Sequence, residues 1–172
     1  MCENIENTNI KSIHPISSPQ ILKDKLNINF DLCGLVKNTR SEIGNILNRK
    51  TKKLIVIIGP CSIHDKDIAL DYATRLSNIK HKLPNLLIIM RVYFEKPRTI
   101  TGWKGYIMDP DLDNSCNIEK GLHLAREIMI NINNKGIPIG CEFLDTISAQ
   151  YISDLVSWGA IGARTTESQL HR

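Results

Sequence analysis

Three short, predominantly apolar runs constrain this chain more than any other feature of its sequence. They span Leu54–Gly59, Leu86–Tyr93 and Ile137–Leu144, and each is followed by a stretch in which apolar residues recur at helical intervals. Strands that are apolar on both faces are typical of parallel sheets, because βα connections place helices over such sheets. The sequence therefore predicts an α/β protein built from consecutive βα units.

The helices expected after these strands have recognisable ends. They cover Asp65–Lys82, Ile118–Asn134 and Ser148–Trp158. Gly136 is expected to end the second helix, because glycine commonly adopts the left-handed conformation that follows a last helical turn. Ser148 is expected to cap the third helix. Ala160–Thr165 is predicted as a fourth strand.

The number of βα units decides between two parallel architectures. A complete (β/α)8 barrel needs about 250 residues, and residues 54–172 hold only about four units, so the sheet cannot close on itself. The competing fold is an open, doubly wound sheet, but its dinucleotide-binding turn is GxGxxG, whereas the first βα turn here is Gly59–Ser62. We therefore predict the first half of a TIM barrel over residues 54–172. Residues 1–53 are predicted as an N-terminal arm and one amphipathic helix, Val36–Asn48.

Composition excludes several classes of protein. The formal net charge is +4 and the basic residues form no block, which argues against a nucleic-acid-binding arm. The five cysteines form no CxxC pair, so neither a disulfide framework nor a structural zinc site is indicated. The longest purely apolar runs are far shorter than the roughly 18 residues of a membrane helix, and the amino terminus is polar. A cytoplasmic protein without membrane contacts is expected.

The residues with chemical potential follow the predicted strands. In parallel α/β folds the active site lies beyond the carboxyl ends of the strands. The candidates there are Cys61 and His64 after the first strand, Arg91, Lys96, Arg98 and Lys104 around the second, Glu142 and Asp145 after the third, and Arg164 and Glu167 after the fourth.

Each of these candidates also has a plain structural interpretation. Cys61 could bind a divalent metal as a thiolate or could be a small buried hydrophobic residue. The basic segment Arg91–Thr99 could bind phosphate or could be a solvated loop in which Glu95 partly balances the charge. Arg164 could belong to the same anion site or could pair with Glu167. The carboxylates after the third strand could perform acid–base chemistry or could balance the arginines.

Two glycines flank Trp103 and Lys104. Gly102 and Gly105 suggest a backbone that must approach another group closely, with the tryptophan excluding water. The plain alternative is a hairpin turn that carries a surface aromatic residue.

Four motifs together resemble the type I 3-deoxy-D-arabino-heptulosonate 7-phosphate (DAHP) synthases of bacteria and yeast. The motifs are Ile57–Asp65, Met90–Thr99, Gly102–Gly105 and Gly159–Arg172, and the similarity runs from about Leu54 to Arg172. The resemblance implies a TIM barrel that condenses phosphoenolpyruvate with erythrose 4-phosphate and releases phosphate, the first step of the shikimate pathway. The Lys-Pro-Arg-Thr motif separates this family from the similar 3-deoxy-octulosonate 8-phosphate synthases.

The resemblance also implies roles for individual residues. Cys61 matches the metal-ligating cysteine, for Mn, Fe, Co or Zn, and Lys96 matches a proposed proton donor. The residues that match phosphoenolpyruvate-binding positions are Arg91, Lys96, Glu142, Gly162, Ala163 and Arg164, and those on the erythrose 4-phosphate side are Pro97, Arg98 and Thr99. Family members assemble through the N-terminal arm, and an exposed apolar face of the helix Val36–Asn48 would suit a homo-oligomer.

The similarity ends before the family's remaining His, Glu and Asp metal ligands. One thiolate cannot hold a catalytic ion, so we expect a partial chain that is inactive alone. The alternative is a non-catalytic phospho-ligand binding or pairing module. An aromatic amino acid is expected as an inhibitor, and Asp109–Leu112 leans weakly towards tryptophan.

Overall fold

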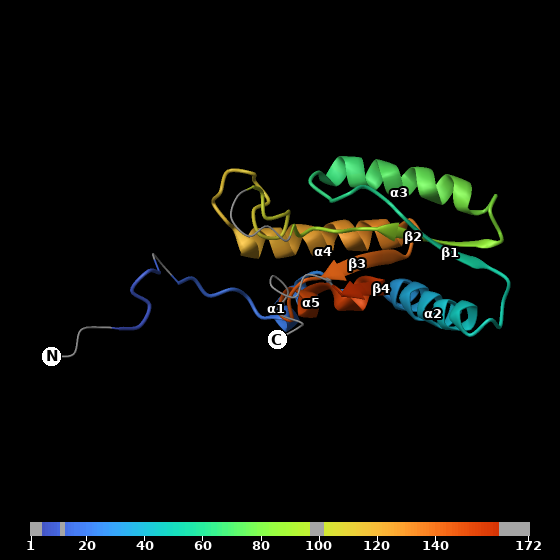
Figure 1. The fold of residues 1–172 in the computed structure, drawn as a ribbon, viewed down its shortest axis with the longest axis horizontal. Coiled ribbons are helices and arrows are strands. Elements are labelled where there is room, and N and C mark those ends of the chain that lie inside the picture. Colours follow the sequence, from blue (N-terminus) through green and yellow to red (C-terminus); the bar gives the residue numbers. More distant parts are fainter. Residues whose placement is uncertain (1–4, 11–12, 97–101, 162–172) are drawn as a thin grey trace.

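The structure is a computed structural model that describes residues 5–10, 13–96 and 102–161. Its centre is a sheet of four parallel strands in the order β1-β2-β3-β4 (Figure 1). The strands are β1 (Leu54–Ile58), β2 (Leu86–Arg91), β3 (Ile139–Phe143) and β4 (Val156–Ile161). Neighbouring strands in the sheet are thus consecutive in the chain, as in a (β/α)8 barrel. The predicted α/β class and the parallel sheet are confirmed.

Helices connect the strands and precede them. They are α1 (Pro19–Lys25), α2 (Phe30–Leu47), α3 (Lys66–Lys80), α4 (Ile118–Asn134) and α5 (Ser148–Ile152), and α5 continues into a short 3-10 helix, η1 (Ser153–Leu155). The predicted bounds of α4 match the structure. Gly136 follows it with φ +71°, which is the left-handed conformation expected at that position. None of the described helices combines the length and apolar character needed to cross a bilayer.

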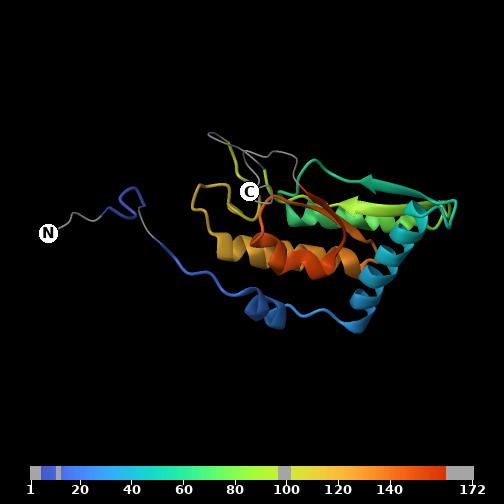
Figure 2. The same cartoon turned by 60° about the horizontal axis from the view of Figure 1, so that its bottom comes forward.

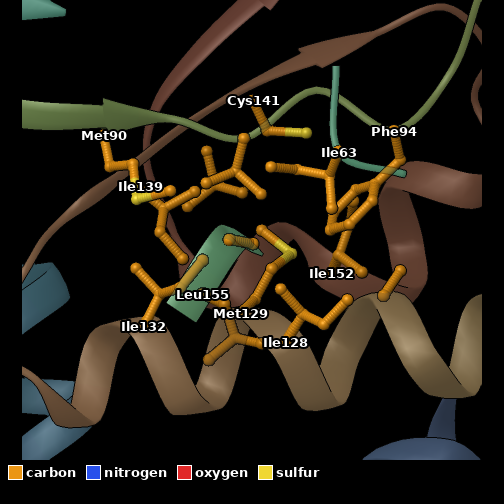
Figure 3. Close-up of a cluster of buried hydrophobic side chains, with 14 of the residues drawn as sticks. Ile63, Met90, Phe94, Ile128, Met129, Ile132, Ile139, Cys141, Ile152 and Leu155 are labelled. Carbon is orange, nitrogen blue, oxygen red and sulfur yellow. The ribbon is translucent and has the colours of Figure 1, made fainter. Parts of the chain in front are cut away.

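The main core lies between the sheet and the helices α3, α4 and α5. Alternate residues of β2 and β3, including Met90, Ile139 and Cys141, point towards Ile128, Met129 and Ile132 of α4 (Figure 3). These side chains are almost fully removed from water, and burial of apolar surface is the main favourable contribution to folding. This packing fixes the orientation of the strands, and thereby the positions of the loops that follow them.

Helix α2 packs at the end of the sheet where the strands begin (Figure 2). It contributes Ile43 to a second, smaller buried cluster with Leu87 and Ile89. The helix is longer than the predicted Val36–Asn48. The expected exposed apolar face is present only in part, because Val36 and Ile43 are buried in the chain's own fold whereas Leu47 is 63% exposed. The sequence shows that a helix has an apolar face but does not show what covers it.

The fourth βα unit departs furthest from the prediction. The chain forms only the short α5 and η1 where a helix Ser148–Trp158 was expected, and β4 begins at Val156 rather than at Ala160. Ser148 is not the N-cap, since it is the first residue of α5. Instead, the carboxylate of Asp145 accepts hydrogen bonds from the main-chain N–H groups of Ile147 (2.6 Å) and Ser148 (2.7 Å).

The N-terminal arm contains one helix that the sequence did not predict, α1. Hydrogen bonds and packing hold the arm against α4 and α5. The fully buried guanidinium of Arg126 on α4 donates to the main-chain oxygens of Leu26 and Tyr151 (both 2.9 Å) and binds both carboxylate oxygens of Asp154. Nearer the amino terminus, the N–H of Ser17 donates to Glu119 (2.8 Å). The part of the arm between these contacts therefore follows the outer surface of the α/β layer.

Among the residues that the structure describes, β1 and β4 form the two edges of the sheet. Leu54 is 66% exposed and Ile161 is 65% exposed, so apolar side chains line both edges. An edge strand presents unpaired main-chain N–H and C=O groups.

Candidate active site

Cys61 lies in the loop that follows β1, and contacts from β2 and its extension fix the shape of that loop. A Cβ added at Gly59 would lie 2.5 Å from the main-chain oxygen of Arg91, so only glycine allows this close approach. Beyond the cysteine, the N–H of Ile63 donates to the oxygen of Tyr93 (2.8 Å), and the Ile63 side chain is buried. The loop is therefore held on both sides of Cys61, whose own side chain is exposed.

Arg91 is the last residue of β2, and its guanidinium reaches across to the Cys61 loop. Its Nη1 donates to the main-chain oxygens of Pro60 and Cys61, both at 2.7 Å. Its Cζ lies 3.9 Å from the centroid of the Tyr93 ring, where the ring quadrupole attracts a cation. These contacts place the guanidinium at the carboxyl ends of β1 and β2.

Lys96 lies beyond β2, on a short antiparallel pairing with residues 104–106. Its main-chain N–H donates to the oxygen of Lys104 (2.9 Å), and the N–H of Tyr106 donates to the oxygen of Phe94 (2.7 Å). Gly105 sits inside this pairing with φ +112°, and a Cβ there would collide with the main chain of Phe94. The predicted close approach at this glycine is confirmed, and it determines where the Lys96 side chain begins.

Trp103 and Lys104 occupy the second strand of this pairing. The Nε1 of the half-buried Trp103 donates to the main-chain oxygen of Asp109 (2.7 Å). The ring therefore braces the loop that leads to α4, and the main chain of Lys104 anchors that of Lys96. The close approach expected for Gly102–Gly105 is therefore present at Gly105, and Trp103 is half-buried rather than a surface aromatic residue.

The side chains of Lys96 and Cys61 meet above the ends of β1 and β2. The Nζ atom of Lys96 lies 3.1 Å from the Sγ atom of Cys61. The pKa of Cys61 is lowered, first by the hydrogen bond from Lys96 and then by its positive charge, with a further contribution from Arg91. An exposed thiol beside two cations is the setting in which cysteine becomes a thiolate, the form that binds metals and attacks electrophiles.

Glu95 is a functional candidate that the sequence analysis treated only as a balancing charge. Its pKa is raised to about 7, first because it is partly buried and then because of the negative charge of Asp145. Glu142, half-buried at the end of β3, adds a smaller effect of the same sign. The only sequence signal was the position of Glu95 between a buried strand and a lysine.

The structure therefore brings together Cys61, Arg91 and Lys96, and it places Glu142 near the end of β3. His64 is exposed at the start of the connection to α3. The remaining predicted site residues lie outside the residues that the structure describes, and their roles stay predictions: Pro97, Arg98, Thr99, Gly162, Ala163 and Arg164.

The fit of this site to a divalent metal rests on Cys61. Its exposed, acidic thiol is a suitable ligand, but no group of three His, Cys, Asp or Glu side chains within residues 5–10, 13–96 and 102–161 could hold an ion. A catalytic metal normally requires three or more protein ligands. The described residues thus supply one ligand and do not form a metal site by themselves.

Consecutive parallel βα units with a cation and thiol cluster at the carboxyl ends of the strands define part of a (β/α)8-barrel protein. Residues 24–172 match the family model described as the DAHP synthetase I family. The chain belongs to this family, which confirms the resemblance seen in its motifs.

Named relatives are about half identical to this chain over the aligned residues. It is 48% identical over 171 residues to a phospho-2-dehydro-3-deoxyheptonate aldolase of Amycolatopsis methanolica, covering 99% of this chain and 84% of the relative. The Trp-sensitive and Phe-sensitive enzymes of Escherichia coli K12 are 55% and 51% identical over 138 and 164 residues, covering 80% and 95% of this chain but only 40% and 47% of their own lengths.

A solved structure confirms the fold. The phospho-2-dehydro-3-deoxyheptonate aldolase of Francisella tularensis SCHU S4 superposes with a TM-score of 0.90 and is 49% identical, over 95% of this chain and 48% of that protein. The chain thus spans about half the length of this structure and of the Escherichia coli relatives. Its sheet corresponds to the first half of a TIM barrel.

Proposed function

We propose that the whole protein, of which this chain forms part, condenses phosphoenolpyruvate with erythrose 4-phosphate and one water molecule to give 3-deoxy-D-arabino-heptulosonate 7-phosphate and phosphate. The observation that carries this proposal is the contact between Lys96 and Cys61, beside Arg91, at the carboxyl ends of β1 and β2. Membership of the DAHP synthetase I family supports it.

In this reaction the two cations bind the enol phosphate. The planar guanidinium of Arg91 suits two oxygens of a phosphate or carboxylate, whereas the ammonium of Lys96 is a mobile point charge. As the aldehyde carbon is attacked, its oxygen gains a proton, and Lys96 is the donor within the described site. Holding both reactants in one geometry supplies much of the rate enhancement.

Cys61 supplies one ligand to a divalent metal in the whole protein. When bound, such an ion polarises a carbonyl group as a Lewis acid. The pairing of Cys61 with Lys96 lowers the pKa of the thiol and so favours the thiolate form that a metal requires. The other ligands come from residues outside the described part of the chain.

The remaining proposals follow from the same assignment. Pro97, Arg98 and Thr99 contact erythrose 4-phosphate, and Gly162, Ala163 and Arg164 contact phosphoenolpyruvate together with Glu142. The protein acts in the cytoplasm as a homo-oligomer, and an aromatic amino acid inhibits it. Relatives named Trp-sensitive and Phe-sensitive both match, so the choice of effector rests on the weak lean of Asp109–Leu112 to tryptophan.

The test measures binding of phosphoenolpyruvate to the 172-residue chain by calorimetry. Lys96→Met should weaken binding about tenfold or more, as expected for a lost hydrogen bond to a charged group. Lys66→Met is the matched control, because Lys66 pairs with Glu127 on the helical layer. Equal affinities of the two variants would count against the assignment.

Phosphate release from the two substrates by the whole protein tests the reaction itself. We expect release to require both substrates and a divalent metal. Binding of phosphoenolpyruvate without any release by the whole protein would favour the non-catalytic binding module instead.

A further inference from the structure

Arg91 and Tyr93 lie on the same face of the extended segment that continues β2. The main-chain N–H of Val92 donates to the oxygen of Gly140 (2.8 Å), so the pairing with β3 persists beyond the last residue of β2. Side chains two residues apart in an extended chain point to the same side. Val92 is fully buried, whereas Arg91 and Tyr93 are both half-buried. This alternation sets the ring of Tyr93 beside the guanidinium of Arg91.

The guanidinium of Arg91 lies over the ring of Tyr93. Its Cζ atom is 3.9 Å from the ring centroid, well inside the roughly 6 Å within which the ring attracts a cation. The main chain of the same tyrosine holds the loop that carries Cys61, since its oxygen accepts from the N–H of Ile63 (2.8 Å). Tyr93 therefore contacts both the cation and the loop that the cation binds.

The hydrogen bonds of Arg91 fix one end of its guanidinium. Both come from the Nη1 atom, which donates to the main-chain oxygens of Pro60 and Cys61 at 2.7 Å. The Nε and Nη2 groups form another edge of the guanidinium, and such an edge suits two oxygens of a phosphate or carboxylate. The direction of this edge is set by the two carbonyl groups together with the ring of Tyr93.

The partners that hold Arg91 are neutral. They are two carbonyl oxygens and an aromatic ring, and in the part of the chain that the structure describes no ion pair involves Arg91. Arg126, by contrast, binds both carboxylate oxygens of Asp154. A carboxylate partner would compete with an anionic ligand for the guanidinium, whereas a ring attracts the cation without cancelling its charge. Arg91 is thus held in place with its positive charge available.

We infer that Tyr93 is a positioning residue, whose ring holds the guanidinium of Arg91 so that its Nε and Nη2 groups face an anionic group of the substrate. The inference rests on the proposed function, in which Arg91 binds phosphoenolpyruvate. It predicts that the face of the ring is what matters, and that the hydroxyl group does not. Phenylalanine should therefore replace this tyrosine, and leucine should not.

The first experiment observes the guanidinium by NMR of the 172-residue chain labelled with nitrogen-15 arginine. The signals of Arg91 are identified by their loss in Arg91→Lys. A guanidinium held in one orientation gives separate signals for Nη1 and Nη2, whereas a rotating one gives an averaged signal. We expect separate signals in the unaltered chain and in Tyr93→Phe, and an averaged signal in Tyr93→Leu. Separate signals in Tyr93→Leu, or an averaged signal in the unaltered chain, would overturn the positioning role.

The second experiment measures the affinity of the same chain for phosphoenolpyruvate by calorimetry. Tyr93→Leu should weaken binding about threefold to tenfold, as expected for a lost contact between a cation and a ring. Tyr93→Phe should keep most of the affinity. Tyr72→Leu is the matched control, because Tyr72 is a half-buried tyrosine on α3, and it should bind as the unaltered chain does. An unchanged affinity in Tyr93→Leu, or an equal loss in Tyr93→Phe, would contradict the role of the ring face.

These readouts separate the two proposals. If the unaltered chain does not bind phosphoenolpyruvate, the proposed function loses its support, while the NMR signals still decide whether Tyr93 orients Arg91. If the chain binds phosphoenolpyruvate and Tyr93→Leu keeps separate signals, only the positioning role is wrong. Circular dichroism of each variant reports whether it folds. Tyr93→Met removes the ring by a second route, and the same outcomes apply to it.

Discussion

The buried ion pair between Arg126 and Asp154 offers a direct test of how α4 is joined to η1. The side chain of Arg126 is 1% exposed and that of Asp154 is 27% exposed. Asp154→Asn would leave the guanidinium buried without a countercharge. Arginine stays protonated in proteins, so it cannot become neutral to avoid the cost of a buried charge. Breaking a buried pair in this way costs about 3–5 kcal/mol of unfolding free energy.

The lower part of that range applies here. The asparagine oxygen can still accept one hydrogen bond, and the oxygens of Leu26 and Tyr151 remain in place. We therefore expect Asp154→Asn to lower the free energy of unfolding by about 3 kcal/mol. In a chain of this size that corresponds to a fall in Tm of about 6–12 °C.

Urea unfolding of the 172-residue chain, followed by circular dichroism at 222 nm, measures this effect. The matched control is Asp71→Asn, which breaks an exposed i,i+4 pair with Arg75 and should change the free energy by less than about 0.5 kcal/mol. The double variant Arg126→Met with Asp154→Asn should recover part of the loss, because it removes the unpaired charge. The reasoning is refuted if Asp154→Asn behaves like its exposed control.

Two further predictions concern the site and a helix contact. Lys96→Met should slow alkylation of Cys61 at neutral pH, because the pKa of the thiol loses its main lowering influence, while the chain's other exposed cysteines react unchanged. An unchanged rate at Cys61 would show that the contact has no effect on the thiol. Gly121→Ala should destabilise the chain by about 1–3 kcal/mol, since its Cβ would collide with the main chain at Ile107, whereas Gly34→Ala on α2 meets no atom and should stabilise by about 0.5–1 kcal/mol. Thermal unfolding compares the two, and similar shifts would contradict the packing described for α4.

The sheet could be predicted from the sequence because its strands are apolar throughout and each is followed by a helix. Leu86–Tyr93 and Ile118–Asn134 carry this signal strongly, and the structure places β2 and α4 there. The fourth unit could not be predicted well, since Val156–Ile161 contains a serine, a tryptophan and a glycine and merges with the preceding helical pattern. The burial of α2 was missed because its cover, the sheet, is distant in the sequence.

The site residues that directly follow a strand could be predicted from the sequence. Cys61, Arg91 and Lys96 each come after an apolar run, and the rule that parallel strands end at one edge is enough to bring them together. The raised pKa of Glu95 was not predictable, because it depends on burial and on the charge of Asp145, which follows a different strand. The capping role of Asp145 was also missed, and Ser148 was chosen in its place.

The edge strands β1 and β4 have a consequence for aggregation of the chain during its translation. Each edge offers hydrogen-bonding groups flanked by apolar side chains to any extended segment nearby. Because translation delivers β1 long before later strands exist, this edge stays available for aggregation during elongation.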